Sequence, residues 1–278
     1  MSTPVRTRRR PDTIDPIPWW LKVVGGLVIA FFILPTLFVI PMSFSSATTF
    51  QFPPPGFSLR LYENFFTNPI WLDSLGNSFL VASLTALLAT TVGTAAAVAL
   101  SGLDGRLARL VRTVLMVPIV SPAIVVAVAV YISFLGWRLT GTVTGYVLAH
   151  TAIAVPYVLV SVTGALGGFD QRLLKAAASL GASPLKSFVQ VTMPLISRGI
   201  LTGGIFAFIV SFDEVVIALF LRSPLFQTMP VQMYNSVTVE IDPTISAASS
   251  LMVVAVTIIF ILPQLLRGRA GSRREPRP

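Results

Sequence analysis

The chain has 278 residues, of which 54% are hydrophobic and only 11% carry a charge, with a formal net charge of +9. Soluble domains carry roughly 25% charged residues, and a soluble domain of this length could not cover so much apolar surface, which excludes that class. The absence of cysteine excludes disulfides, thiolate catalysis and Cys-ligated metal. The basic residues are dispersed among tails and loops, which indicates contact with lipid headgroups and not with nucleic acid.

Six apolar stretches are each long enough to cross about 30 Å of hydrocarbon, which requires about 20 helical residues. They cover residues 19–43, 76–101, 112–135, 142–163, 199–221 and 244–266. Backbone groups in lipid must be satisfied within their own segment, so these stretches are expected to be helices. The predicted fold class is therefore all-α, a polytopic membrane protein with six transmembrane helices.

The distribution of lysine and arginine predicts the orientation of this domain. With six spans both termini lie on one side, and all but three of the 20 lysine and arginine residues fall on that side. Such residues accumulate in cytoplasmic loops, so both termini and the loop 164–197 are expected to be cytosolic. The predicted parts are a basic N-terminal tail over 1–18, a transmembrane domain over 19–266 and a basic C-terminal tail over 267–278.

The two longer segments on the outer side are small. Residues 44–75 contain a predicted short helix at the membrane interface, because aromatic residues favour that depth. The residues that indicate it are Leu59, Leu61, Tyr62, Phe65 and Phe66, and residues 222–243 form the second segment. Neither segment is large enough to form a ligand-binding domain of its own.

Small residues and prolines mark the second to fourth spans. Ala86, Ala89, Thr90, Gly93 and Ala97 recur three or four residues apart, a spacing that lets helix backbones approach closely in lipid. Helix packing is the preferred interpretation of this pattern over ligand contact. The prolines predict kinks or broken turns, which occur in helices that line a transport pathway and equally in ordinary packing. These prolines are Pro118, Pro122 and Pro156.

The cytosolic loop 164–197 reads as two short helices joined by a tight turn. Residues 170–180 favour a helix with Asp170 near its start, and Gly181 is suited to end it in the left-handed conformation. Ser183 fits an N-cap with Pro184 at the first position of a second helix, which is expected to run until Pro194. The residues alone leave open whether this rigid projection is a docking element or an ordinary interfacial hairpin.

The spacing within this loop resembles the E-A-A, three residues, G, nine residues, I-x-L-P motif of ABC-importer permeases. Lys175-Ala176-Ala177 are followed by three residues, Gly181, nine residues and Val191-Thr192-Met193-Pro194. Further stretches resemble the spermidine/putrescine branch of that family. They include Leu148 to Thr151, Pro156 to Val158, Ala177 to Pro184, Ala207 to Glu214 and Glu240 to Ile245.

The resemblance implies a type I importer permease of the bacterial cytoplasmic membrane. Its loop would dock into a separate ATPase, present in two copies, and a second homologous permease and an extracytoplasmic solute-binding protein would complete the importer. ATP and Mg2+ would be used by the ATPase, with no cofactor in this chain. The implied docking residues are Lys175, Ala176, Ala177, Gly181, Ala182, Ser183, Pro184 and Pro194.

Lys175 departs from the family pattern. The family commonly has glutamate at this position, where its carboxylate is thought to meet a basic residue of the ATPase. A lysine reverses the charge, so this ion pair is not carried over to the present chain. Gly181 and Pro194 are kept, which leaves docking by shape and apolar contact as the expectation.

Asp213 and Glu214 are the acidic residues well inside a predicted span. Asp213 lies about 21 Å from Gly199 at 1.5 Å per helical residue, and ionisable groups at such depth indicate either a pathway or a paired contact. Neighbouring side chains point about 100° apart, so one acid can meet a cationic solute while the other pairs or caps a helix break. Tyr157 and Phe212 could add cation–π attraction.

The sequence offers no catalytic site. His150 is the sole histidine and lacks partners for a metal, so a packing or hydrogen-bonding role is expected and no metal site is predicted. No P-loop motif occurs, so the chain is not expected to be an enzyme. The predicted function is an ABC permease for a polyamine or related solute. The alternatives are an ion-coupled secondary transporter, a permease for another solute such as a phosphonate or iron chelate, and, more remotely, a membrane-embedded enzyme.

Overall fold

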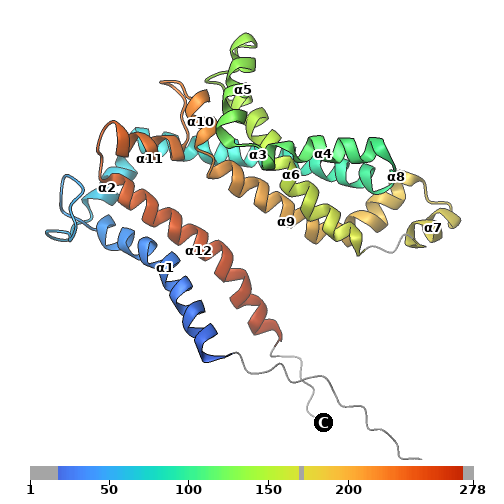
Figure 1. Ribbon diagram of the computed structural model, residues 1–278, viewed down its shortest axis with the longest axis horizontal. Helices are drawn as coiled ribbons and strands as arrows, with labels where there is room; N and C mark the ends of the chain where they lie inside the picture. The colour runs from blue at the N-terminus through green and yellow to red at the C-terminus, as the bar shows by residue number, and fades with distance from the viewer. Residues whose placement is uncertain (1–17, 169–171, 272–278) are drawn as a thin grey trace, which may run out of the picture. The chain divides into compact units, whose positions relative to one another are not determined.

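A computed structural model describes residues 18–168 and 172–271, and every regular element in these ranges is a helix (Figure 1). Residues 1–17 and 272–278 of the predicted basic tails, and Asp170, lie outside the described residues. The helices form two compact units. One comprises the described residues up to Ala47, then Gln51–Leu61 and those from Ser246, and the other comprises Thr48–Phe50 and Tyr62–Ile245.

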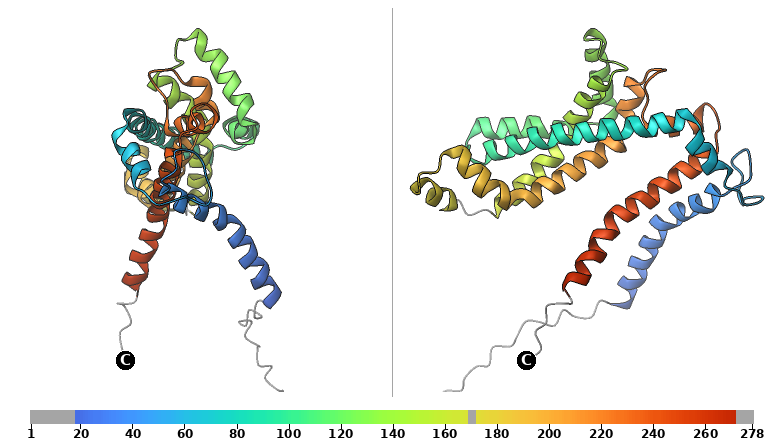
Figure 2. Two further views of the ribbon diagram at one scale, coloured as in Figure 1. Left: turned by 90° about the vertical axis from the view of Figure 1, so that its left-hand side faces the viewer. Right: turned by 180° about the vertical axis from the view of Figure 1, so that it is seen from behind.

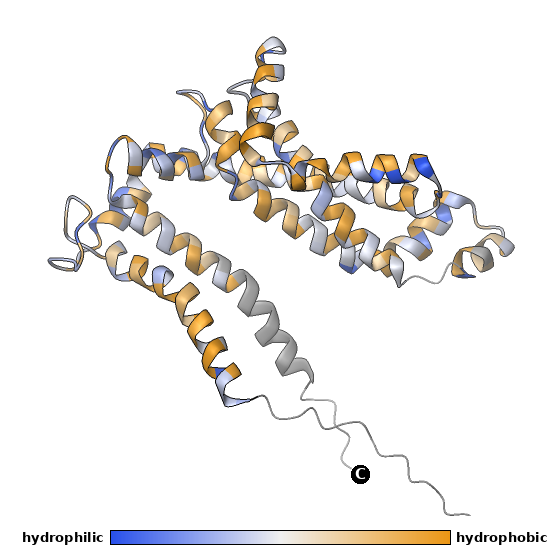
Figure 3. Ribbon diagram, in the orientation of Figure 1, coloured by the Kyte–Doolittle hydropathy of each residue, from blue (hydrophilic) through white to orange (hydrophobic). Residues whose placement is uncertain are grey.

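The first unit contains α1 (Trp19–Ser43) and most of α12 (Thr244–Gly271). The loop after α1 folds back onto this helix, because the ring of Phe52 packs edge-on against Phe38 with centroids 5.2 Å apart. The side chains of α1 are mostly exposed, and Figure 3 shows that they are largely hydrophobic. A helix with so much apolar surface requires lipid or a partner helix around it.

The second unit is built around α3 (Pro69–Ser101), α6 (Val143–Gly167) and α9 (Met193–Phe212), which lie side by side along their length (Figure 2). Small residues set this packing. A Cβ added at Gly93 of α3 would lie 2.7 Å from the Cβ of Val158, and one added at Gly203 would lie 3.0 Å from the Cα of Val158. The predicted packing role of the small-residue stripe is therefore confirmed.

The third predicted span, 112–135, is not a single helix. It consists of α4 (Arg106–Val120) and α5 (Ala123–Gly136), which meet at an angle of 105°. The break consists of Ser121 and Pro122, and Pro118 lies within α4. The missing N–H of proline and its restriction of the preceding residue explain the break. By contrast, α6 continues through Pro156 as one helix.

The fifth predicted span, 199–221, is also interrupted. α9 ends at Phe212 and α10 (Val216–Leu221) begins after a three-residue break, so one continuous helix was a wrong expectation here. Two shorter helices lie in the segments that were predicted to be on the outer side. They are α2 (Arg60–Thr67), where a short helix was expected, and α11 (Met229–Thr238). Ser78 of α3 accepts a 2.7 Å hydrogen bond from the N–H of Met229, which anchors the start of α11.

The loop between α6 and α9 contains α7 (Arg172–Ser179), α8 (Pro184–Ser187) and the π-helical turn η1 (Phe188–Thr192). Among the described residues, four helices are long and apolar enough to cross a membrane, or five if the bent α4–α5 pair is one span. The predicted total of six spans, and the cytosolic position of the termini, stay predictions.

Candidate functional site

The turn after α7 has the geometry that ends a helix on glycine. Gly181 has φ +80°, its N–H donates to the carbonyl of Ala178 at 3.0 Å, and the N–H of Ala182 donates to the carbonyl of Ala177 at 3.0 Å. This pair of bonds is a Schellman motif, in which a left-handed residue satisfies the last carbonyls of the helix. The predicted stop at Gly181 is confirmed.

The second half of the loop begins as predicted and continues further. The Oγ of Ser183 accepts a hydrogen bond from the N–H of Lys186 at 3.4 Å, and Pro184 occupies the first turn of α8. The expected end at Pro194 is wrong, because Pro184–Phe212 forms one helical rod of 29 residues. The π-turn η1 directly precedes Met193-Pro194, and wider i→i+5 bonding there accommodates a residue that lacks an N–H.

The loop presents apolar and basic side chains to its surroundings. Leu180 is 89% exposed and Leu185 is 73% exposed, whereas Ser187 and Ile196 are buried. α7 packs against α8 and η1, so the projection is folded onto the base of the long rod. Between Arg172 and Arg198 the sequence has no acidic residue. The arrangement suits a partner surface with an apolar cleft. Lys175, Ala176 and Ala177 lie in α7.

The break between α9 and α10 separates the two predicted acids by role. The Oε1 of Glu214 accepts a 2.8 Å hydrogen bond from the N–H of Ile217, so this carboxylate caps the first turn of α10. Asp213 ends α9 through its N–H, which donates to the carbonyl of Ile209 at 3.0 Å. Its side chain is exposed and has no hydrogen bond or ion pair with any described residue. Of the two acids, Asp213 is therefore the one whose carboxylate has no partner among the described residues.

Three aromatic rings gather beside this break. Phe212 stacks on Phe208 with centroids 5.6 Å apart and meets Phe79 of α3 edge-on at 5.1 Å. Tyr157 does not join them. Val158 lies against Gly203, and Gly203 precedes the break by about two and a half helical turns, so Tyr157 lies at a different level from Asp213. Sequence reasoning missed Phe79, which carried no signal beyond an apolar residue in a span.

His150 has the packing and hydrogen-bonding role that was predicted for it. Its ring is fully buried, and its Nδ1 shares a 2.9 Å hydrogen bond with the Oγ of Ser211 on α9. Within residues 18–168 and 172–271 no cluster of three histidine, cysteine or acidic side chains could hold a metal ion.

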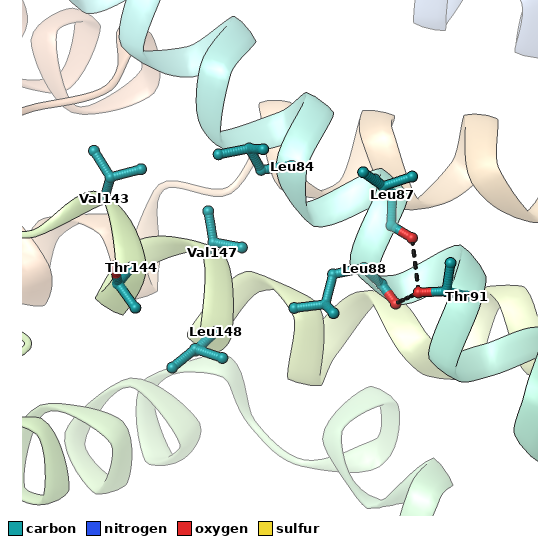
Figure 4. A pocket seen from close by; sticks show the side chains of 8 residues that line it. All are labelled: Leu84, Leu87, Leu88, Thr91, Val143, Thr144, Val147 and Leu148. Carbon is teal, nitrogen blue, oxygen red and sulfur yellow. Dashed lines mark hydrogen bonds between the residues drawn. The ribbon is translucent and has the colours of Figure 1, made fainter.

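An open groove lies between α3 and α6 in the second unit (Figure 4). Its lining is almost entirely aliphatic, and the hydroxyl of Thr91 is occupied by hydrogen bonds to the carbonyls of Leu87 and Leu88 at 3.0 and 2.9 Å. The lining contains no charged side chain, so the groove is no candidate site for a charged solute. Its other lining residues are Leu84, Val143, Thr144, Val147 and Leu148.

Comparison with known proteins agrees with this geometry. The chain is 30% identical to the spermidine/putrescine transport system permease protein PotC of Escherichia coli (strain K12), over 86% of this chain and 90% of that protein. It is 30% identical to the putrescine transport system permease protein PotI of the same organism, over 92% of this chain and 93% of that protein.

A solved structure shows the same fold. It is the crystal structure of a bacterial ABC transporter involved in the import of the acidic polysaccharide alginate, with a TM-score of 0.67 at 15% identity, covering 91% of this chain and 99% of that one. The family model described as "binding-protein-dependent transport system inner membrane component" matches residues 89–271. The chain thus belongs to the family of inner-membrane components of binding-protein-dependent transport systems.

Proposed function

We propose that this chain is the permease subunit of an ATP-driven importer that moves a polyamine or a closely related small cation into a bacterial cell. The similarity to PotC and PotI over most of the chain carries this proposal. The site supports it, because Asp213 offers a carboxylate without a partner among the described residues, close to the rings of Phe212, Phe208 and Phe79. A carboxylate beside aromatic faces suits an ammonium group.

The proposed assembly rests on the resemblance of the loop to the docking loop of importer permeases. A single docking loop engages one ATPase, and P-loop ATPases of this type work in pairs, so the complete importer requires two ATPase copies and a second homologous permease. An extracytoplasmic solute-binding protein delivers the solute, since the outer segments are short. Six spans with both termini cytosolic place the loop on the same side as the ATPases. ATP and Mg2+ act in the ATPase subunits.

The rod Pro184–Phe212 supplies the mechanical link between the docking loop and the break at Asp213. The 29 residues of Pro184–Phe212 span about 44 Å at 1.5 Å per residue, from the docking loop to the break that carries Asp213. A rigid helix transmits a displacement of its cytosolic end to its other end. Closure of the ATPases on ATP would therefore move the break and bias the permease between inward- and outward-facing states.

The test is reconstitution of the complete importer in liposomes, with the binding protein outside and ATP inside. We expect uptake of spermidine or putrescine that requires both ATP and the binding protein. A nonhydrolysable ATP analogue is the matched control and should abolish uptake. Uptake driven by an ion gradient without any ATPase would establish the secondary-transporter alternative instead.

A binding screen on the solute-binding protein tests the identity of the solute separately. Affinity for di- and polyamines is the expected result. Binding of a phosphonate or an iron chelate, with none for polyamines, would refute the polyamine assignment and leave the permease assignment standing.

A further inference from the structure

Two side chains on one face of α6 contact the two helices that flank the break, α9 and α10. Tyr146 and His150 are four residues apart, so they lie one above the other on the same helical face. Their rings meet edge-on with centroids 5.8 Å apart, and both side chains are fully buried. This spacing was visible in the sequence, but only the fold shows what the two side chains reach.

The two side chains reach opposite sides of the break. The Nδ1 of His150 shares its hydrogen bond with Ser211, in the last turn of α9. The hydroxyl of Tyr146 donates a 3.1 Å hydrogen bond to the carbonyl of Ala218 in α10. Asp213 lies between these two anchored residues, in the three-residue segment 213–215 that belongs to neither α9 nor α10.

The surroundings make these two hydrogen bonds effective. Ile217, Ala218 and Leu221 of α10 are buried in one apolar cluster with Tyr146, and the ring of Phe226 packs on Tyr146 at 5.2 Å. In such a setting a hydrogen bond has no competition from water and its loss leaves a polar group unsatisfied. Movement of α10 against α6 would therefore require the Tyr146 bond to break, and movement of the last turn of α9 against α6 would require the His150 bond to break.

We infer that Tyr146 and His150 are positioning residues that clamp the break and thereby hold the Asp213 carboxylate at the solute pathway. Glu214 completes the clamp by capping α10 from within the break. This inference rests on the proposed function, because it assigns the clamp to the passage of a cationic solute. It adds the claim that α6 sets how efficiently that solute is moved, without contacting it.

The test compares conservative variants in the reconstituted importer. Tyr146→Phe removes one hydroxyl and Ser211→Ala removes the partner of His150, and each leaves the apolar packing in place. For either variant we expect maximal uptake per ATP hydrolysed to fall about fivefold, the effect of one neutral hydrogen bond. The concentration of loaded binding protein that gives half-maximal uptake should not change, because docking lies elsewhere.

Matched controls separate a clamp from general damage. The Tyr131 ring also packs on α10, against Phe220 at 6.0 Å, but its hydroxyl makes no hydrogen bond with a described residue. Ser133 bonds only the carbonyl of Ala129 in its own helix, at 2.8 Å. Tyr131→Phe and Ser133→Ala should therefore keep the wild-type value of maximal uptake per ATP hydrolysed. A parallel fall of uptake and ATP hydrolysis in the clamp variants would show a merely structural role and overturn the inference.

A spectroscopic readout makes the inference independent of the solute. The chain has no cysteine, so Val215→Cys gives a unique attachment site for a spin label inside the break, with Asp213 left intact. We expect the mobility of the label to increase when Tyr146→Phe or Ser211→Ala is added. It should not change when Tyr131→Phe is added. Unchanged mobility would overturn the clamp even if polyamine uptake is established. Failure of wild-type polyamine uptake with increased label mobility would refute only the solute.

Discussion

The two ends of the rod Pro184–Phe212 are built by different means. At its N-terminal end the preceding turn is closed by neighbours in sequence, since Gly181, Ala182 and Ser183 all bond residues within five positions. At its other end the break is held mainly by residues far away, with His150 bonded to Ser211 and Tyr146 to Ala218. The docking loop is thus a local structure, and the break is a tertiary one.

The two ends of the rod should therefore be sensitive to different kinds of substitution. A change in the loop acts through backbone conformation and should affect coupling to the ATPase while the bundle stays folded. A change at the break acts through the bundle or through the solute and should leave docking intact. Measuring ATP hydrolysis and uptake on the same variant distinguishes a defect in the loop from a defect at the break.

Gly181→Val should have the largest effect. No atom lies within 4 Å of a Cβ added at Gly181, so the valine would not clash. The free-energy cost of the substitution is therefore the backbone strain at φ +80°. A β-branched residue there is strained by about 2 kcal/mol, which corresponds to about a thirtyfold loss of the correctly turned loop. Stimulated ATP hydrolysis and uptake should fall together while membrane insertion survives. Gly181→Asn, which tolerates the left-handed conformation, is the control and should retain most activity. Normal coupling in Gly181→Val would show that the loop is not the transmission element.

Asp213→Asn should have the next largest effect. Unlike Gly181→Val, it should lower uptake without lowering ATP hydrolysis. The substitution keeps size and polarity but removes the charge expected to meet an ammonium group. Uptake of a polyamine should fall about tenfold, the scale of one partly screened charge contact, while stimulated ATP hydrolysis stays near normal. The measurement is uptake per ATP in liposomes. Unchanged or increased polyamine uptake would remove Asp213 from the pathway.

Glu214 offers an internal comparison at the same break. Glu214→Gln keeps an oxygen that can accept from the N–H of Ile217, whereas Glu214→Ala removes the cap. Loss of a cap costs about 1 kcal/mol, so uptake should fall about fivefold in Glu214→Ala and little in Glu214→Gln. Equal, large losses in both variants would show instead that the charge of Glu214 is needed and that the solute contacts it.

The contrast between the ends also explains what the sequence could predict. Gly181, Ser183 and Pro184 carry local signals with a known backbone geometry, so the turn and the start of α8 were predicted correctly. Continuation past Pro194 was missed because a π-turn absorbs the proline, and nothing local distinguishes that from a helix end. The break at Asp213 lacks proline or glycine and depends on Tyr146 and His150, whose partners become evident only when α6 packs on α9 and α10.

The smallest predicted effect concerns Lys175, where the charge of the docking helix is reversed relative to the family pattern. Because the sequence has no acidic residue between Arg172 and Arg198, we expect the loop to meet an ATPase as a basic surface, and the matching cleft should carry carboxylates. Exposed ion pairs contribute at most about 1 kcal/mol, so Lys175→Glu should weaken stimulation of ATP hydrolysis by no more than about fivefold. The loss should shrink as salt is raised, because screening weakens repulsion between like charges. Lys175→Gln, which only removes the charge, should lie between the wild type and Lys175→Glu. Stronger stimulation by Lys175→Glu would mean that the cleft is basic and that docking relies on the exposed Leu180 and Leu185 in spite of an unfavourable charge.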